Sequence, residues 1–355
     1  MNLFYASFIP GLQDFIAGVV RERLSDVKIH RLLDGAVVFE TETSYDKLNF
    51  FCFNNIFAVI DIMEHEDKSG AIEKHISAVC NSAVNLHQIA VNSKNIRTFR
   101  IVVSNENVPA SIDEKLRSQA ELFILRHSGL KVNRSLPDTE FWFLYRNESD
   151  SKTKEKPSSK DFSIFMKRLT LRSSWEKTLH KGELVPPLAW TLCRLACLTH
   201  NDTVLDPFCG YGSIPETAMK QFHITKFIAC DNDDEAASYT AEKFKKRTRG
   251  EFILHKSDFN ALPSLAAEKS IDVIITDPPW GIYKKNGGSG FPGKMFGVFG
   301  KLLKDGGKAV VLYANDESFL KAIPADFEVQ SSIPILLSGK KAVIYVMRYK
   351  EEKRL

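Results

Sequence analysis

The second half of the chain alternates short apolar runs with segments of helical spacing. Strand-like runs occupy 203–208, 226–230, 251–255, 271–276 and 308–313, and helix-like segments near 215–221 and 235–247 separate the first three of them. This alternation predicts a mostly parallel, doubly wound sheet. Two longer runs, 327–337 and 341–349, are joined by Ser338-Gly339-Lys340 and predict an antiparallel hairpin at the end of that sheet.

The first 147 residues follow a mixed pattern without a glycine-rich phosphate loop. Helical spacing over 12–24 precedes strand-like runs at 36–40 and 98–103. Ser111 and Glu114 have the spacing of a capping box, which predicts a helix to about His127 that ends at Ser128-Gly129. An aromatic strand over 140–146 follows. This part is therefore expected to be an α+β module.

Length and composition indicate an ordinary folded protein with more than one domain. The 355 residues are 44% hydrophobic and 26% charged, and the polar stretch over 148–161 predicts a linker. No apolar run approaches the roughly 20 residues of a membrane span, and the start of the chain lacks the pattern of a signal peptide. We expect a soluble, unexported, cytoplasmic protein.

Cysteine usage and charge restrict the partners. The six cysteines form neither a CxxC pair nor a Cys/His cluster with zinc-ligand spacing, so no metal is expected. The first 150 residues contain 16 Lys and Arg against 20 Asp and Glu, whereas the rest contain 32 against 24. A basic second part suits a polyanion, although solvated lysines are the plain alternative. The candidate contacts to such a polyanion are Arg172, Lys181, Lys284 and Lys285, the last two in a basic, glycine-rich loop.

The first motif with chemical content is Asp206-Pro-Phe208-Cys-Gly210-Tyr-Gly212, between a predicted strand and a predicted helix. The two glycines allow a sharp turn and a close approach of the backbone to a ligand. Residue 215 is Pro, so the third glycine of a pyrophosphate-binding loop is missing. The motif resembles motif I of RNA and DNA amino-methyltransferases. This resemblance implies that Asp206 faces the ammonium group of S-adenosylmethionine and that Phe208 and the glycine backbone lie beside this cofactor.

Acidic residues also follow the next two strands. Asp231-Asn232 stands about twenty residues past the glycines, where a carboxylate can accept hydrogen bonds from both ribose hydroxyls of an adenosine. The alternative is that one acid of this stretch only caps the following helix. Asp258-Phe259 comes after the third strand, and the methyltransferase resemblance implies contacts with the adenine amino group and ring.

The decisive motif is Asp277-Pro278-Pro279-Trp280, directly after a very apolar strand. An exocyclic amine of a base is a poor nucleophile because its lone pair is delocalised into the ring. A carboxylate and a fixed main-chain carbonyl can accept hydrogen bonds from its two N–H groups and so localise that lone pair. The base can stack on the face of a tryptophan. The bland alternative is a proline turn beside an incidental tryptophan.

Both halves together resemble the THUMP-domain class I RNA methyltransferases, in particular the tRNA guanine-N2 methyltransferase branch. In the first half the resemblance rests on Tyr5-Ala6, Pro10-Gly11-Leu12, 97–103, Lys131-Val132-Asn133 and Leu136-Pro137-Asp138. It implies an N-terminal ferredoxin-like region over 1–60, a THUMP domain over 61–147, a linker over 148–162 and a Rossmann-like methyltransferase domain over 163–355. The THUMP region would dock tRNA, and we expect a monomer, although an activating protein partner stays open.

The chain departs from this branch at the catalytic motif. Family members often have Asn or Asp, then Pro-Pro or Leu-Pro, and then Tyr, Phe or His, whereas this chain has Asp-Pro-Pro-Trp, which also suits adenine or cytosine amines. The alternatives are therefore the same chemistry on ribosomal or small nuclear RNA, adenine-N6 methylation of a nucleic acid, and a non-enzymatic RNA-binding protein.

Overall fold

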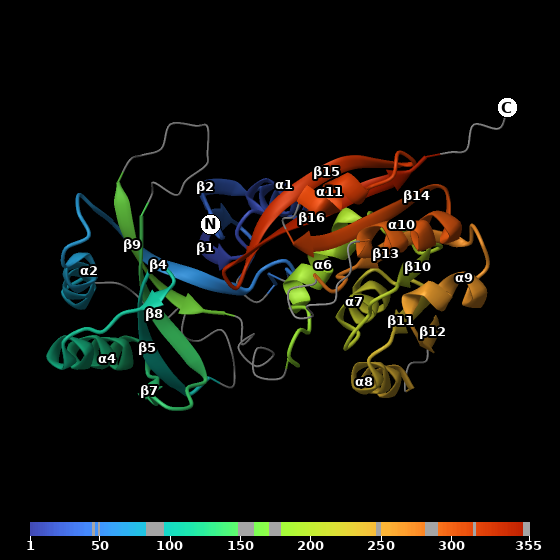
Figure 1. The fold of residues 1–355 in the computed structure, drawn as a ribbon. Helices are drawn as coiled ribbons and strands as arrows, with labels where there is room; N and C mark the ends of the chain where they lie inside the picture. The colour runs from blue at the N-terminus through green and yellow to red at the C-terminus, as the bar shows by residue number, and fades with distance from the viewer. Residues whose placement is uncertain are drawn as a thin grey trace. The chain divides into compact units, whose positions relative to one another are not determined.

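The structure is a computed structural model that describes residues 1–44, 47–48, 50–82, 96–147, 160–169, 179–245, 250–280, 290–314 and 317–350. The chain divides into two compact units, Met1–Ser174 and Trp175–Leu355 (Figure 1). Each unit has its own sheet. In the described part of the chain, no helix is both long and apolar enough to cross a membrane.

The first unit is built on a mixed sheet with the strand order β2-β3-β1-β4-β9-β8-β5-β6, in which β7 also pairs with β5. Its strands are β1 (Asn2–Ser7), β2 (Lys28–Leu33), β3 (Ala36–Thr41), β4 (Asn55–His65), β5 (Thr98–Asn105), β6 (Val108–Pro109), β7 (Lys131–Val132), β8 (Thr139–Arg146) and β9 (Asp161–Arg168). Its helices are α1 (Gln13–Arg23), α2 (Ala71–Cys80) and α4 (Glu114–Ser128). The expected mixture of helices and strands is present.

Helices α2 and α4 share a core with β5, β8 and β9 in this unit. Ile76 and Ile124 from the two helices are completely buried against Phe99, Phe141 and Phe165 of the sheet. Figure 1 shows both helices beside these strands. The sheet of the first unit is thus held by a conventional apolar core.

The start of α4 differs from the expected capping box. The helix begins at Glu114, and the carboxylate of Asp113 accepts hydrogen bonds from the backbone N–H groups of Lys115 and Leu116. Asp113 therefore takes the N-cap position that the spacing assigned to Ser111, because its carboxylate reaches two unpaired N–H groups at once. The predicted end is confirmed, since Gly129 follows the helix in the left-handed conformation with φ 71°.

Strands β4 and β9 cross the domain boundaries expected from the sequence. β4 spans the expected boundary between residues 60 and 61 and pairs antiparallel with β9, which also pairs with β8. Phe162, Ile164 and Met166 of β9 are completely buried in the first unit. Residues up to 168 thus belong to the first sheet, whereas the expected methyltransferase domain began at 163. An apolar run suits a buried strand of either sheet, and its sequence alone does not specify the strands with which it pairs.

The second unit contains the expected doubly wound sheet, with the strand order β12-β11-β10-β13-β14-β16-β15. Its strands are β10 (Thr203–Asp206), β11 (Lys226–Asp231), β12 (Glu251–Lys256), β13 (Ile271–Thr276), β14 (Leu303–Ala314), β15 (Phe327–Leu337) and β16 (Lys340–Tyr349). Its helices are α6 (Pro186–Leu195), α7 (Ser213–Gln221), α8 (Asp234–Lys245), η2 (Phe259–Ala261), α9 (Leu262–Leu265), α10 (Phe291–Leu302) and α11 (Glu317–Ala322).

Strands β10 to β14 are parallel, and β16 is antiparallel to both β14 and β15. The predicted C-terminal hairpin is confirmed. Ser338 and Gly339 at its turn have φ 47° and 80°, as a two-residue turn of type I′ requires.

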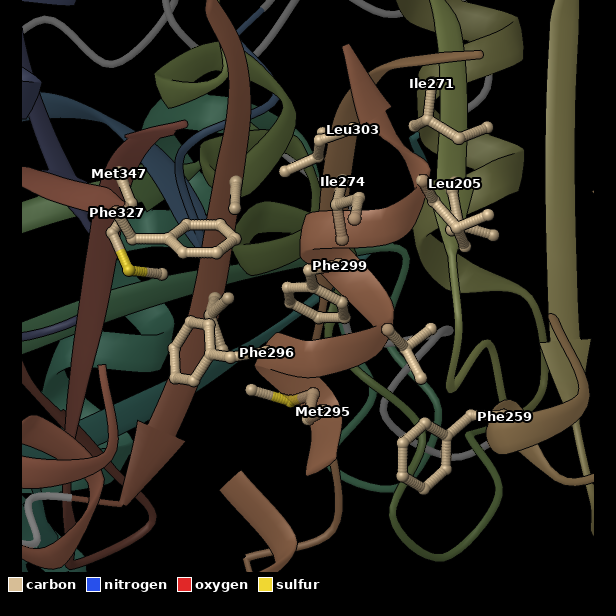
Figure 2. Close-up of a cluster of buried hydrophobic side chains, with 14 of the residues drawn as sticks. Leu205, Phe259, Ile271, Ile274, Met295, Phe296, Phe299, Leu303, Phe327 and Met347 are labelled. Atoms are coloured by element: carbon tan, nitrogen blue, oxygen red, sulfur yellow. The ribbon is translucent and has the colours of Figure 1, made fainter. Parts of the chain in front are cut away.

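The core of the second unit orients the ends of its central strands. Figure 2 shows Leu205 of β10 and Ile274 of β13 near Phe299 of α10. All three side chains are completely buried. Since these strands are packed along their length, the residues that follow them are held at fixed positions along the carboxyl edge of the sheet.

Candidate active site

The carboxyl edge of the second sheet collects the acidic residues singled out in the sequence. Asp206 ends β10, Asp231 ends β11, Asp258 follows β12 and Asp277 follows β13. These four strands are parallel neighbours, so their carboxyl ends lie at the same edge. In open α/β sheets this edge is where ligands bind.

The glycine loop between β10 and α7 is tied down on both sides. The N–H of Gly210 donates to Oδ2 of Asp231 at 2.6 Å, and the hydroxyl of Thr240 donates to the carbonyl of Gly210 at 2.8 Å. Lys243 Nζ donates to the carbonyl of Tyr211 at 3.1 Å. Gly210 and Gly212 have φ 49° and 82°, a backbone conformation that disfavours other residues.

Asp206 presents an oxygen atom that has no partner. Its Oδ1 accepts from the hydroxyl of Thr276 at 2.8 Å and from the N–H of Phe208 at 3.1 Å, whereas Oδ2 is buried without a hydrogen bond. Burial raises the pKa of this carboxyl to about 8, against the lowering effect of its two hydrogen bonds. A buried acceptor without a partner costs free energy, so this atom fits a cationic donor of a ligand.

Asp231 does not cap the next helix. Asp233 caps α8, because its Oδ1 accepts from the N–H groups of Glu235 and Ala236 at 3.0 Å each. Asp231 is partly exposed, and its carboxylate accepts the N–H of Gly210 at 2.6 Å and the N–H of Asp233 at 2.9 Å. A carboxylate has about four lone-pair positions, so it retains capacity for ligand hydroxyls. Asn232 is exposed at the same turn.

An aromatic wall stands beside these acids. The rings of Phe208 and Phe259 are 4.9 Å apart, and Phe291 lies 5.7 Å from the first and 5.6 Å from the second. Asp258 is exposed and caps η2 through the N–H of Asn260. Sequence reasoning missed Phe291, because only the fold brings the start of α10 to the glycine loop.

Asp277 is held by the tryptophan of its own motif. Trp280 Nε1 donates to Oδ1 of Asp277 at 2.9 Å. Burial raises the pKa of Asp277 to about 7, and this hydrogen bond works in the opposite direction. Pro278 is buried, Pro279 is exposed, and Trp280 is partly buried against the core of the unit. The motif therefore combines a carboxyl group whose pKa lies near neutral pH with an indole hydrogen-bonded to it.

Of the four basic candidates, only Lys181 lies within the described residues. It is exposed, next to His180, whose ring stacks on Tyr211 of the glycine loop with centroids 4.0 Å apart. Glu183 accepts from the hydroxyl of Ser213 at 3.2 Å, a contact that the sequence did not indicate. Arg172, Lys284 and Lys285 lie outside the described residues.

The two glycines of the loop provide a matched pair of substitutions. A Cβ atom on Gly212 would lie 3.0 Å from both Cγ2 and Oγ1 of Thr240, whereas one on Gly210 would meet nothing within 4 Å. Both substitutions share the cost of a positive φ, about 1–2 kcal/mol. We expect Gly212→Ala to lower the free energy of unfolding more than Gly210→Ala, as measured by urea denaturation. Equal losses would contradict the close contact with Thr240.

Gly210→Ala is expected to act mainly on ligand binding. Its added methyl group would enter the open space at the carboxyl edge, where the S-adenosylmethionine expected from the sequence would pass. We expect calorimetry to show S-adenosylhomocysteine bound at least about 10-fold more weakly, since an overpacked contact costs about 1–3 kcal/mol. Unchanged affinity would mean that the ligand does not pass over this residue.

Part of the sequence matches a known methyltransferase family, and curated proteins are similar to it. Residues 173–332 match the family described as "RMKL-like, methyltransferase domain". The tRNA (guanine(10)-N2)-dimethyltransferase of Methanocaldococcus jannaschii is 27% identical over 275 residues, which cover 73% of this chain and 71% of that protein. A protein of Methanothermococcus thermolithotrophicus named "Probable tRNA (guanine(10)-N2)-dimethyltransferase" is 33% identical over 128 residues, 35% of this chain and 76% of that protein.

The fold has a close counterpart among solved structures. The crystal structure of TrmN from Thermus thermophilus aligns with a TM-score of 0.76 at 19% identity, covering 98% of this chain and 100% of that one. At this identity the likeness concerns the fold. It confirms the α/β class predicted from the order of strands and helices.

Proposed function

Because the chain belongs to the RMKL-like methyltransferases, we propose that it transfers a methyl group from S-adenosylmethionine, the cofactor of class I methyltransferases, to the N2 amine of a guanosine in tRNA. The two archaeal relatives named for this reaction support the choice of base and RNA. The observation that carries the proposal is the pairing of two carboxylates at one sheet edge. Asp206 offers an unpaired oxygen to a cation, and Asp277 stands after the neighbouring strand.

The residues at the carboxyl edge fit the parts of the cofactor. Oδ2 of Asp206 would accept from its ammonium group, and Asp231 would accept from the ribose hydroxyls. Phe208 and Phe259 would flank the adenine, with Asp258 and Asn232 near its rim. When bound, S-adenosylmethionine supplies an activated methyl group on a positively charged sulfur.

Asp277 would prepare the guanine amine as a nucleophile. Its carboxylate and the carbonyl of Pro278 would accept the two N–H groups, so that the nitrogen lone pair becomes localised. Pro278 and Pro279 restrict the backbone around that carbonyl. Trp280 would support the ring of the base while its N–H holds Oδ1 of Asp277. After transfer, the surplus proton can leave to Asp277 or to water.

The first unit would hold the tRNA, and the exposed Lys181 would contact its phosphates. Arg172, Lys284 and Lys285 remain proposals of the same kind from the sequence alone. We expect a monomer that acts in the cytoplasm.

The proposal is tested by transfer of a radiolabelled methyl group to separate pools of tRNA, ribosomal RNA, small nuclear RNA and duplex DNA. We expect label in tRNA, recovered as N2-methylguanosine and mapped to one position. Label confined to another RNA pool would overturn the choice of substrate. Label in N6-methyladenosine would overturn the choice of base. Bound cofactor without any transfer would support a binding protein or a missing partner subunit.

The pH dependence of the reaction should report Asp277. With saturating S-adenosylmethionine, kcat/KM for tRNA is expected to rise with pH through about 7, because only the ionised carboxylate accepts both an amine N–H and the indole N–H. Trp280→Phe keeps an aromatic ring but removes the hydrogen bond that lowers the pKa of Asp277. We therefore expect this variant to shift the rising limb to higher pH in steady-state assays. An unshifted limb would show that another group titrates.

A further inference from the structure

Thr276 connects the two acidic residues of the site. It is the last residue of β13, it directly precedes Asp277, and its side chain is completely buried. Strands β10 and β13 pair in parallel with Leu205 opposite Ile274, so the residues that follow lie close across the two strand ends. The hydroxyl of Thr276 donates to Oδ1 of Asp206 at 2.8 Å.

The hydrogen bonds of Asp206 are distributed unequally between its oxygens. The second donor, the N–H of Phe208, also reaches Oδ1, at 3.1 Å. Oδ2 is buried and has no hydrogen-bond partner. The terminal torsion of an aspartate is broad, so in the absence of such donors the carboxylate could rotate and exchange its two oxygens. Because both donors bind Oδ1, the carboxylate of Asp206 is held in one orientation and Oδ2 points in a single direction.

We propose that Thr276 is a positioning residue for cofactor binding: its hydroxyl fixes Asp206 so that Oδ2 is available for the ammonium group of S-adenosylmethionine. This inference rests on the proposed function. The competing explanation is a threonine that only satisfies a buried acid and stabilises the fold. The two explanations differ in which ligands should bind more weakly when the hydroxyl of Thr276 is removed.

The direct test compares Thr276→Val with Thr276→Ser. Valine has nearly the shape of threonine without the hydroxyl, and serine retains the hydroxyl. Calorimetry would measure affinity for S-adenosylhomocysteine and for 5′-methylthioadenosine, which has the same adenosine and thioether but no ammonium group. We expect Thr276→Val to lower the affinity for S-adenosylhomocysteine about 10-fold, which corresponds to one hydrogen bond to a charged group. The affinity for 5′-methylthioadenosine should fall by less than about twofold. Thr276→Ser should restore most of the lost affinity.

The analogue without the ammonium also controls for folding. A variant with a distorted site would lose both ligands in parallel, and that result would overturn the positioning role. Full affinity of Thr276→Val for S-adenosylhomocysteine would overturn it as well. In steady-state assays, Thr276→Val should raise the KM for S-adenosylmethionine with a smaller change in kcat, and an effect on kcat alone would contradict the inference.

A double-mutant cycle tests whether Thr276 acts through Asp206. In an Asp206→Asn background, Thr276→Val should cause less than about a twofold further loss of S-adenosylhomocysteine affinity, because the group that it positions is already altered. Additive losses would contradict the inference. A wild-type protein that binds S-adenosylhomocysteine but does not methylate tRNA would defeat the proposed function while the Thr276 comparison still stands. A wild-type protein that does not bind it would defeat both.

Discussion

Asp277→Asn is expected to reduce the rate of methyl transfer by at least about 100-fold, the usual effect of removing one group that stabilises a transition state. Asparagine has almost the same shape, and it can still accept the indole N–H of Trp280. It carries no negative charge, however, and therefore accepts the N–H of the amine more weakly and cannot compensate the positive charge that develops on the nitrogen. Asp277→Ala should abolish transfer, with RNA affinity nearly unchanged.

Single-turnover assays with radiolabelled cofactor would measure this loss, and calorimetry and filter binding would measure the affinities for S-adenosylhomocysteine and tRNA. Both affinities should stay within about threefold of wild type, since Asp277 acts on the reacting amine. Asp305→Asn is a matched control, because Asp305 lies near the start of β14 and away from the carboxyl edge. Turnover of Asp277→Asn at the wild-type rate would refute the assigned role.

Asp206→Asn should change cofactor affinity and protein stability in opposite directions. Loss of the charge that faces the ammonium group is expected to lower the affinity for S-adenosylhomocysteine by about 100-fold, because hydrogen bonds between charged groups contribute about 1.5–3 kcal/mol. In the ligand-free protein the same charge lowers the free energy of unfolding, since Oδ2 is buried without a partner. The substitution removes this destabilising charge.

The stability effect should depend on pH in a defined direction. Burial raises the pKa of Asp206 to about 8 in the folded protein, so between about pH 4 and 8 the folded state holds a proton that the unfolded state has released. The wild type therefore loses stability as pH rises through this window. We expect urea denaturation to show Asp206→Asn more stable than wild type at pH 8.5 and the difference to shrink toward pH 4.

Asp305→Asn again serves as the control, with no such pH-dependent gain. A variant that is destabilised equally at both ends of the window would show that Asp206 contributes to the fold in its ionised form. A variant with unchanged affinity for S-adenosylhomocysteine would show that the ammonium group does not contact Asp206.

The positions of the candidate acids could be predicted, but their connections could not. Asp206, Asp231 and Asp277 follow apolar runs whose alternation with helices implies neighbouring parallel strands, so the sequence could place them at one edge. That Thr276 donates to Asp206 depends on the exact register of β10 against β13, and that Trp280 donates to Asp277 depends on side-chain torsions. Neither is encoded in local spacing.

Phe291 shows the same limit at longer range. Its ring completes the aromatic wall with Phe208 and Phe259, although it lies more than thirty residues from either along the chain. No periodicity in the sequence connects these positions. Packing of α10 against the sheet brings them together.

By itself, the sequence determined the type of the second unit, because hydrophobic periodicity and turn residues act locally and the helices and strands occur in a distinctive order. It also led to the chemistry that we propose for Asp277-Pro278-Pro279-Trp280, because these side chains are adjacent in the chain. Only the tertiary structure decided that β9 belongs to the first sheet and that Asp206 has one oxygen without a partner. Both depend on contacts between residues far apart in sequence, and such contacts are selected by the packing of the whole unit.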